Sequence, residues 1–138
     1  ICNERFGCQI DPDRVERDRT EYFFSHLDQL RLVDPVVSFA RSLHGRRPLA
    51  VASGSDRNIV LRELRHLGLL DLFPVVVTAD DVARSKPAPD LFLLAAERLG
   101  VPATSCLVFE DGKNGLRAAE AAGMPWVYVP TNDSLTLH

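Results

Sequence analysis

Short apolar runs of strand length alternate with helix-type segments through most of this chain, and this alternation limits the fold more than any other feature. The apolar runs lie at residues 48–52, 74–78, 106–109 and 125–129. Segments with helical spacing lie at residues 57–67, 89–99 and 114–122, and each is followed by a glycine that can end a helix. Strands that alternate with helices favour an α/β fold with a doubly wound parallel sheet, in which right-handed crossovers place helices on both faces.

Two Asp-Pro pairs mark helix starts in the first third of the chain. Asp11-Pro12 provides an N-cap and a first-turn proline, so it predicts a helix from about residue 12 to 30. Asp34-Pro35 repeats this arrangement before a second helix that is expected to stop at Gly45. Both helices precede the first apolar run, so they stand outside the regular alternation.

Composition excludes several functional classes. The 138 residues are 46% hydrophobic and carry a formal net charge of −3, which provides no basic field for nucleic acid or anionic lipid. No stretch approaches the roughly 20 apolar residues of a membrane span. Cys2, Cys8 and Cys106 are odd in number and have no CxxC spacing, so a disulfide framework or zinc site is not expected, and a reducing cytoplasm suits them. The first residue is Ile1, from which we expect a processed or partial chain.

Polar clusters follow two of the predicted strands, at the end of the sheet where ligands bind in such folds. The first is Ser53-Gly54-Ser55, whose hydroxyl and backbone amides could donate to phosphate oxygens, although serine at this place is also a good helix N-cap. The second is Glu110-Asp111, an adjacent carboxylate pair of the kind that Mg²⁺ uses together with water and a substrate phosphate. Its alternative interpretation is a capping acid beside a solvated glutamate.

A third cluster precedes the helix at 89–99. In Ser85-Lys86-Pro87-Ala88-Pro89-Asp90 two prolines stiffen the backbone around a lysine, directly before a helix. The ammonium group of Lys86 is therefore displayed near a helix N-terminus, where it could meet a phosphate. A lone lysine in a loop is more often ordinary solvated surface, and this alternative also stays open.

Together these segments resemble motifs II, III and IV of the haloacid dehalogenase superfamily, in order and at suitable separations. The resemblance covers about residues 33–129 and includes Gly115 and the helix that ends at Gly123. It is closest to the subgroup that contains beta-phosphoglucomutase and fructose-1-phosphate phosphatase-like proteins. It implies that residues 1–32 are the remnant of a helical cap and that residues 33–138 are a partial α/β core.

The resemblance also implies a role for each cluster. Ser53 and the amide of Gly54 would bind the transferring phosphoryl group, Lys86 would neutralise its charge, and Glu110 and Asp111 would hold Mg²⁺. Positioning and charge stabilisation are the tasks on which phosphoryl transfer mainly depends. The substrate would be a small phosphorylated sugar or similar metabolite, with Ser55, Arg57 and Asn58 as candidate contacts. For Arg57 and Asn58, a solvent-facing first helical turn is the better expectation.

Motif I of that family, a strand ending in Asp-x-Asp-Gly-Thr, does not occur in the sequence. In the family its first aspartate is the nucleophile that forms an aspartyl phosphate, and the second is the general acid and base. Asp11-Pro12-Asp13 has the spacing of the two aspartates, but it reads better as a helix start. The chain is therefore expected to begin after motif I, inside the cap.

The missing motif has a structural consequence as well. In the resembled sheet its strand lies centrally, between the strand that ends at Ser53 and the strand that ends at Glu110. Without it two strand edges lack a hydrogen-bonding partner, so we expect direct pairing, a swapped segment or association with another chain.

Three functions follow as alternatives. The first is a magnesium-dependent phosphatase or phosphomutase, of which this chain alone is inactive. The second is a non-catalytic relative that binds phosphate or a protein partner. The third is a receiver-like domain, which Thr78-Ala79-Asp80-Asp81 fits only loosely.

Overall fold

The structure, a computed structural model, describes residue 7 and residues 10–130. Its contacts divide the chain into two units, Ile1–Arg31 and Leu32–His138. The identity of the first unit as a cap remnant stays a prediction. Cys106 is a free thiol, whereas Cys2 and Cys8 lie outside the described residues.

The first unit contains helix α2 (Pro12–Ser25) and the short 3₁₀ helix η1 (Leu27–Gln29). Asp11 is the N-cap of α2, and its Oδ1 accepts a hydrogen bond of 3.0 Å from the backbone N–H of Asp13. Pro12 occupies the first helical position, where its missing N–H costs nothing. Asp11-Pro12-Asp13 is therefore a helix start, as the sequence predicts, and not the end of a strand.

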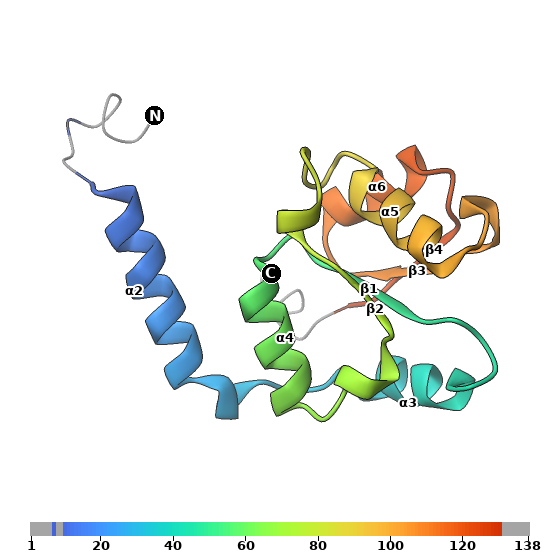
Figure 1. The fold of residues 1–138 in the computed structure, drawn as a ribbon, viewed down its shortest axis with the longest axis horizontal. Coiled ribbons are helices and arrows are strands. Elements are labelled where there is room, and N and C mark those ends of the chain that lie inside the picture. The colour runs from blue at the N-terminus through green and yellow to red at the C-terminus, as the bar shows by residue number, and fades with distance from the viewer. Residues whose placement is uncertain (1–6, 8–9, 131–138) are drawn as a thin grey trace. The chain divides into compact units, whose positions relative to one another are not determined.

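The second unit contains the predicted alternation of strands and helices (Figure 1). Its elements in chain order are α3 (Asp34–Leu43), β1 (Ala50–Ala52), α4 (Arg57–His66), η2 (Leu70–Leu72), β2 (Val75–Val77), η3 (Ala79–Asp81), α5 (Asp90–Leu99), η4 (Ala103–Ser105), β3 (Val108–Glu110), α6 (Lys113–Ala121) and β4 (Trp126–Tyr128). The glycine signals are confirmed, and Gly100 ends α5 in the left-handed conformation with φ of 69°.

Helices cover both faces of β1 and β2. Val51 and Val76, which are register partners, pack in the cluster that α4 builds with Val60 and Leu64. The next residue along β2, Val77, faces the other way and packs on Leu91 of α5. This alternation is the two-residue period of a strand buried on both sides.

The second pair of strands follows the same rule. Val108 of β3 packs with Phe92 of α5 and with the alanines of α6, whereas the neighbouring Phe109 contacts Phe39 of α3 at a ring-centroid distance of 5.6 Å. One face of β3 therefore meets α5 and α6, and the other meets α3. The α/β class and its two helix layers are confirmed.

The strands do not form one continuous sheet. Within residues 10–130, β1 pairs in parallel with β2, and β3 pairs in parallel with β4, as two separate two-stranded sheets. Direct pairing of β1 with β3, one of the expected ways to close the gap, does not occur in this part of the chain. Phe109 remains 37% exposed, and the three residues of β4 are 39–46% exposed. An interior sheet strand would bury such side chains.

None of the helices in the described part of the chain is long and apolar enough to cross a membrane.

The packing of α5 gives a test of the core. Leu91 is fully buried against Val77 and Ala95, so Leu91→Ala should lower the free energy of unfolding by about 2–5 kcal/mol. Leu93, on the same helix, is 43% exposed, and Leu93→Ala should change it by no more than about 0.5 kcal/mol. Urea denaturation followed by circular dichroism measures both, and equal losses would contradict the assigned orientation of α5.

Candidate active site

The second and third predicted clusters meet through an ion pair. Lys86 Nζ donates a hydrogen bond of 2.7 Å to Glu110 Oε2, although the two residues are 24 positions apart in the sequence. Both side chains are largely buried, 17% exposed for Lys86 and 12% for Glu110. The ammonium also lies 5.1 Å from the ring centroid of Phe92, which favours a cation at this point. Lys86 is thus a largely buried cation fixed by an ion pair, and the interpretation as a solvated surface lysine is wrong.

Glu110 is held from three sides. It is the last residue of β3, and its Oε1 accepts a hydrogen bond of 3.1 Å from the backbone N–H of Gly112. Its side chain also lies directly against Gly115 in the first turn of α6, where a Cβ atom would stand 2.0 Å from Glu110 Cδ. Only glycine leaves room for the carboxylate in this position, which explains why α6 has a glycine despite its helix-weakening effect.

The first cluster forms a tight turn at the end of β1. The backbone N–H of Ser53 continues the pairing with β2 by donating to Val77 O at 2.9 Å, and Ser53 Oγ accepts from the N–H of Ser55 at 3.1 Å. Gly54 is exposed, and a Cβ on it would lie 3.3 Å from Ser85 Oγ. The turn therefore lies beside the segment that carries Lys86.

Neither polar cluster acts as a helix cap. The N-cap of α4 is Asp56, three residues beyond Ser53, and the N-cap of α6 is Gly112, one residue beyond Asp111. The capping interpretations that the sequence left open are therefore wrong for Ser53 and for Asp111. The Ser53 hydroxyl stabilises its own turn, and the Asp111 carboxylate stands next to Glu110 at the strand end.

The pKa values of the two adjacent carboxylates are shifted in opposite directions. Burial acts to raise the pKa of Glu110, but the hydrogen bond and charge of Lys86, with the N–H of Gly112, hold that pKa below its usual value. Loss of hydration, the contact with Glu110 and the negative charge of Glu110 raise the pKa of Asp111. The positive charge of Lys86 also acts on Asp111, but it does not outweigh burial and the neighbouring Glu110, and it forms a direct hydrogen bond only with Glu110.

A divalent cation fits this pair chemically. Hard cations take carboxylate oxygens, and Mg²⁺ commonly uses one or two of them with water and substrate phosphate completing its shell. A cation beside Asp111 would relieve the repulsion that raises its pKa. The part of the chain that the structure describes contains no group of three or more His, Cys, Asp or Glu side chains that could hold a metal by itself.

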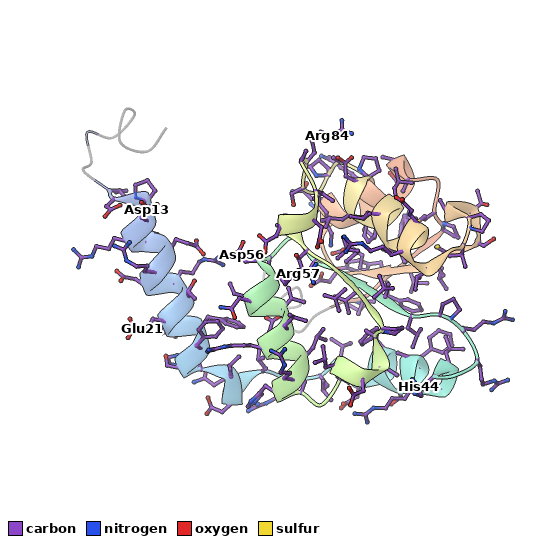
Figure 2. All side chains as sticks on the ribbon, viewed as in Figure 1. Asp13, Glu21, His44, Asp56, Arg57 and Arg84 are labelled. Carbon is purple, nitrogen blue, oxygen red and sulfur yellow. The ribbon has the colours of Figure 1, made fainter. Side chains whose placement is uncertain are left out.

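The three candidate substrate contacts, Ser55, Arg57 and Asn58, lie at the start of α4 but differ in their surroundings. Ser55 is half-buried, and its carbonyl accepts a hydrogen bond from Ala79 N–H at 3.1 Å. Asn58 is exposed in the first turn of α4. Arg57 begins α4 next to Asp56 (Figure 2), and its guanidinium bonds Asp81 at 2.5 Å and the carbonyl of Val76 at 3.3 Å. The solvent-facing orientation expected for both Arg57 and Asn58 is therefore confirmed for Asn58 and wrong for Arg57.

A polar network next to the Ser53 turn was not predicted from the sequence. Asp81 and Thr78 form a capping box on η3, a pattern that the Thr-x-x-Asp spacing could have indicated. These bonds leave the Asp80-Asp81 pair in a structural network, since Asp80 accepts from the backbone of Arg57. Nothing in the local sequence indicates that Arg57 and Arg98 would join it, because both are distant along the chain.

This sequence is similar to those of known proteins. Residues 3–123 match the haloacid dehalogenase-like hydrolase family. The fructose-1-phosphate phosphatase YqaB of Escherichia coli (strain K12) is 48% identical over 120 residues, which cover 87% of this chain and 64% of that protein. The phosphorylated carbohydrates phosphatase of Thermotoga maritima is 36% identical over 115 residues, covering 83% of this chain and 52% of that protein.

The fold is also found among solved structures. The crystal structure of CbbY from Rhodobacter sphaeroides in complex with phosphate superposes with a TM-score of 0.77 at 27% identity, covering 95% of this chain and 61% of that one. The chain thus spans less than two thirds of the length of each of these relatives. With the family match over most of the sequence, and with the α/β fold and the ordered clusters described above, the chain belongs to the haloacid dehalogenase-like hydrolase family.

Proposed function

We propose that this chain supplies the phosphate-binding and metal-binding parts of a magnesium-dependent phosphoryl-transfer site for a small phosphorylated sugar, of the phosphatase or phosphomutase type. The contact between Lys86 and Glu110 carries the proposal, because it joins two clusters that no local interaction would bring together. The printed functions of the relatives YqaB and the Thermotoga maritima phosphatase support the substrate class.

Each cluster then has a task. Ser53 and the exposed amide of Gly54 hydrogen-bond the phosphoryl oxygens. Lys86 offsets charge on the transferring group, and it is already held near the site by Glu110. Glu110 and Asp111 hold Mg²⁺, which when bound supplies further positive charge to the phosphoryl group. Ser55 and Asn58 are the proposed contacts to the rest of the substrate, and the cytoplasm is the proposed location.

The nucleophile must come from elsewhere, because the sequence contains no Asp-x-Asp-Gly-Thr motif. We propose that an extended strand with this motif inserts between β1 and β3. The support is that β1 and β3 lie between the same helix layers, but each pairs only with an outer strand within residues 10–130. Such an insertion, by association or strand swapping, would satisfy both inner edges and cover Phe109.

A non-catalytic function is the second candidate. The same open strand edges, with exposed Trp126, Val127 and Tyr128 on the adjacent strand, would suit a module that binds phosphate or a protein partner without turnover. Activity measurements distinguish the two.

Complementation in trans tests the catalytic proposal. The chain alone should release phosphate from p-nitrophenyl phosphate or fructose 1-phosphate at background rate with or without magnesium, because it has no nucleophile. Addition of a synthetic peptide, an apolar strand ending in Asp-x-Asp-Gly-Thr, should produce magnesium-dependent release of phosphate.

The matched control is the same peptide with its first aspartate replaced by asparagine, which should give no release. If neither peptide has an effect while the chain binds phosphate, the non-catalytic alternative is favoured. Robust magnesium-dependent release by the chain alone that survives Asp111→Ala would refute both the expected inactivity and the assigned metal site.

The metal site can be tested without turnover. Mn²⁺ in place of Mg²⁺ should broaden the NMR amide signals of residues 110–112, because a paramagnetic ion relaxes nuclei near it. Asp111→Asn should remove this broadening. Glu120→Gln, on an exposed position of α6, should leave it unchanged. Broadening that persists in Asp111→Asn would place the ion elsewhere.

The Lys86–Glu110 pair makes stability depend on pH in a defined direction. Lys86→Met should lower the free energy of unfolding by about 1–3 kcal/mol near pH 7. Glu110 has a lowered pKa in the folded chain, so its contribution is complete above the ordinary glutamate pKa of about 4.3 and is lost as the pH falls through the lower folded value. The difference between wild type and Lys86→Met, from urea denaturation at several pH values, should therefore shrink below about pH 4. A difference that is constant from pH 7 to about 3 would show that lost packing, not charge, causes the effect.

A further inference from the structure

Two turns at the ends of β1 and β2 are bonded to each other through side chains. The first turn, residues 53–57, carries Ser53 and Gly54 and starts α4. The second, residues 78–81, forms η3 and leads after five residues to Lys86. Two aspartates each add one bond between the turns, since the backbone N–H of Arg57 donates to Asp80 and its guanidinium donates to Asp81.

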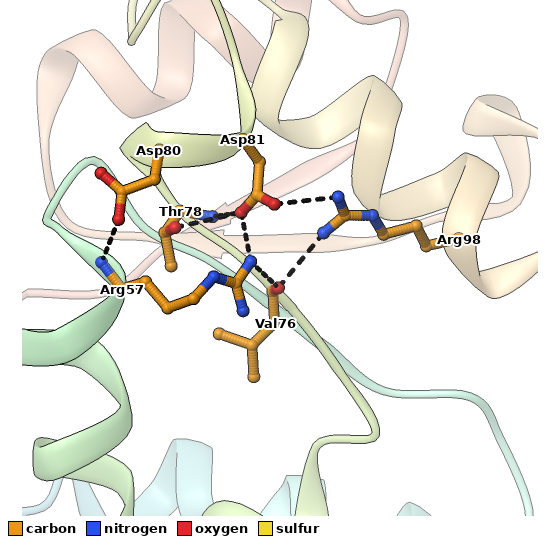
Figure 3. Close-up of polar contacts among 6 residues, drawn as sticks. All are labelled: Arg57, Val76, Thr78, Asp80, Asp81 and Arg98. Carbon is orange, nitrogen blue, oxygen red and sulfur yellow. Dashed lines mark hydrogen bonds and ion pairs between the residues drawn. The ribbon is translucent and has the colours of Figure 1, made fainter.

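Asp81 is the centre of these bonds (Figure 3). Its Oδ2 accepts from the backbone N–H of Thr78 at 2.8 Å and from the Thr78 hydroxyl at 3.0 Å, and Thr78 is completely buried. The same oxygen accepts from Arg57 Nη2 at 2.5 Å. One carboxylate oxygen therefore connects the end of β2 with the start of α4.

The other oxygen of Asp81 adds a third element. Its Oδ1 accepts from Arg98 Nη2 of α5 at 2.9 Å. Both guanidinium groups also reach the carbonyl of Val76 in β2, from Arg57 at 3.3 Å and from Arg98 at 3.4 Å (Figure 3). Helices from the two opposite layers are thus bonded to one carboxylate and to one strand carbonyl.

Asp80 makes an independent link between the turns. Its Oδ2 accepts from the backbone N–H of Arg57 at 2.9 Å, so the capping acceptor for the first turn of α4 comes from the neighbouring turn. The N–H of Ala79 donates to Ser55 O at 3.1 Å. These bonds leave little freedom for the Ser53–Ser55 turn to shift relative to residues 78–81.

The carboxylate of Asp81 keeps its charge. Burial acts to raise its pKa, but the hydrogen bonds from Thr78, Arg98 and Arg57 outweigh burial and hold that pKa far below the usual aspartate range. Asp81 is therefore ionised at physiological pH, where both arginine contacts are ion pairs. Arg57 and Arg98 of this network bond to protein groups. They therefore affect phosphate binding by fixing the position of the Ser53–Ser55 turn.

We propose that Asp81 is a positioning residue: it fixes the Ser53–Ser55 turn against the segment that leads to Lys86, so that both phosphate-binding groups face one ligand. The backbone of Gly54 lies near that segment, since a Cβ added to Gly54 would stand 3.3 Å from Ser85 Oγ. This inference rests on the proposed phosphate-binding function, but its first consequence, a rigid link between the two turns, does not.

Amide hydrogen exchange tests the link directly. In Asp81→Asn, exchange of the Ala79 and Arg57 amides, which bond across the turns, should accelerate about tenfold or more. The amides of Val108 and Val129, in the other pair of strands, should change by less than about threefold. Glu120→Gln, which removes an exposed carboxylate on α6 of the same unit, is the matched control and should leave the exchange of all four amides unchanged.

A titration with inorganic phosphate, followed by the NMR signals of residues 53–55, tests the functional consequence. Asp81→Asn should weaken phosphate binding about threefold to tenfold, since misplaced donors bind less well. Met124→Ala, which destabilises the buried cluster of α5 and α6, controls for a general loss of stability and should leave the affinity unchanged. A positioning role would move the affinity, whereas a merely structural role would move only the unfolding midpoint.

These measurements distinguish failure of the Asp81 proposal from failure of the proposed phosphate-binding function. Unaltered exchange at Ala79 and Arg57 in Asp81→Asn overturns the proposal, and so does a phosphate affinity no lower than in Met124→Ala. If the unmodified chain binds no phosphate, the proposed function fails, while the exchange data still decide whether Asp81 holds the turns. Should Asp81→Asn not fold, Arg98→Met removes one of the two arginine contacts and keeps the Thr78–Asp81 box, so it supports the same comparison.

Discussion

Two-sided packing of short parallel strands is the constraint on which the second unit depends. Successive residues of β1 and β2 face opposite helix layers, so Val76 belongs to the cluster of α4 and Val77 to that of α5. Three-residue strands form few backbone hydrogen bonds, and the apolar surface buried on both faces must supply most of the stabilisation, at roughly 25 cal/mol for each Å². Every loop that carries a polar cluster starts from the end of one of these strands.

Side-chain contacts connect the two strand pairs, β1–β2 and β3–β4, which no backbone pairing joins within residues 10–130. Lys86, beyond β2, bonds Glu110 at the end of β3. Asp81 similarly connects β2 with α4 and α5. The charged groups proposed to bind phosphate and metal therefore also hold the strand ends together, which couples the geometry of the site to the stability of this end of the unit.

Much of the fold could be predicted because its signals are local. Asp11-Pro12 and Asp34-Pro35 marked helix starts, although Asp34 lies in the first turn of α3 and Val33 is its N-cap. Glycines such as Gly100 marked helix ends through a backbone conformation that other residues avoid. The capping roles of Ser53 and Asp111 could not be decided in the same way. Several residues near each helix start can cap, and the choice of Asp56 and Gly112 depends on how the strand ends lead into the helices.

The sequence by itself determined the order of strands and helices, the family, and the residue types of the three clusters, because periodicity, caps and motifs are written in neighbouring residues. Only the tertiary structure decided that Lys86 meets Glu110, that Gly115 makes room for this carboxylate, and that Arg57 and Arg98 join Asp81. It also decided that the strands form two separate pairs. These contacts join residues far apart in the chain, so they depend on how the strands and helices pack, which no local pattern specifies.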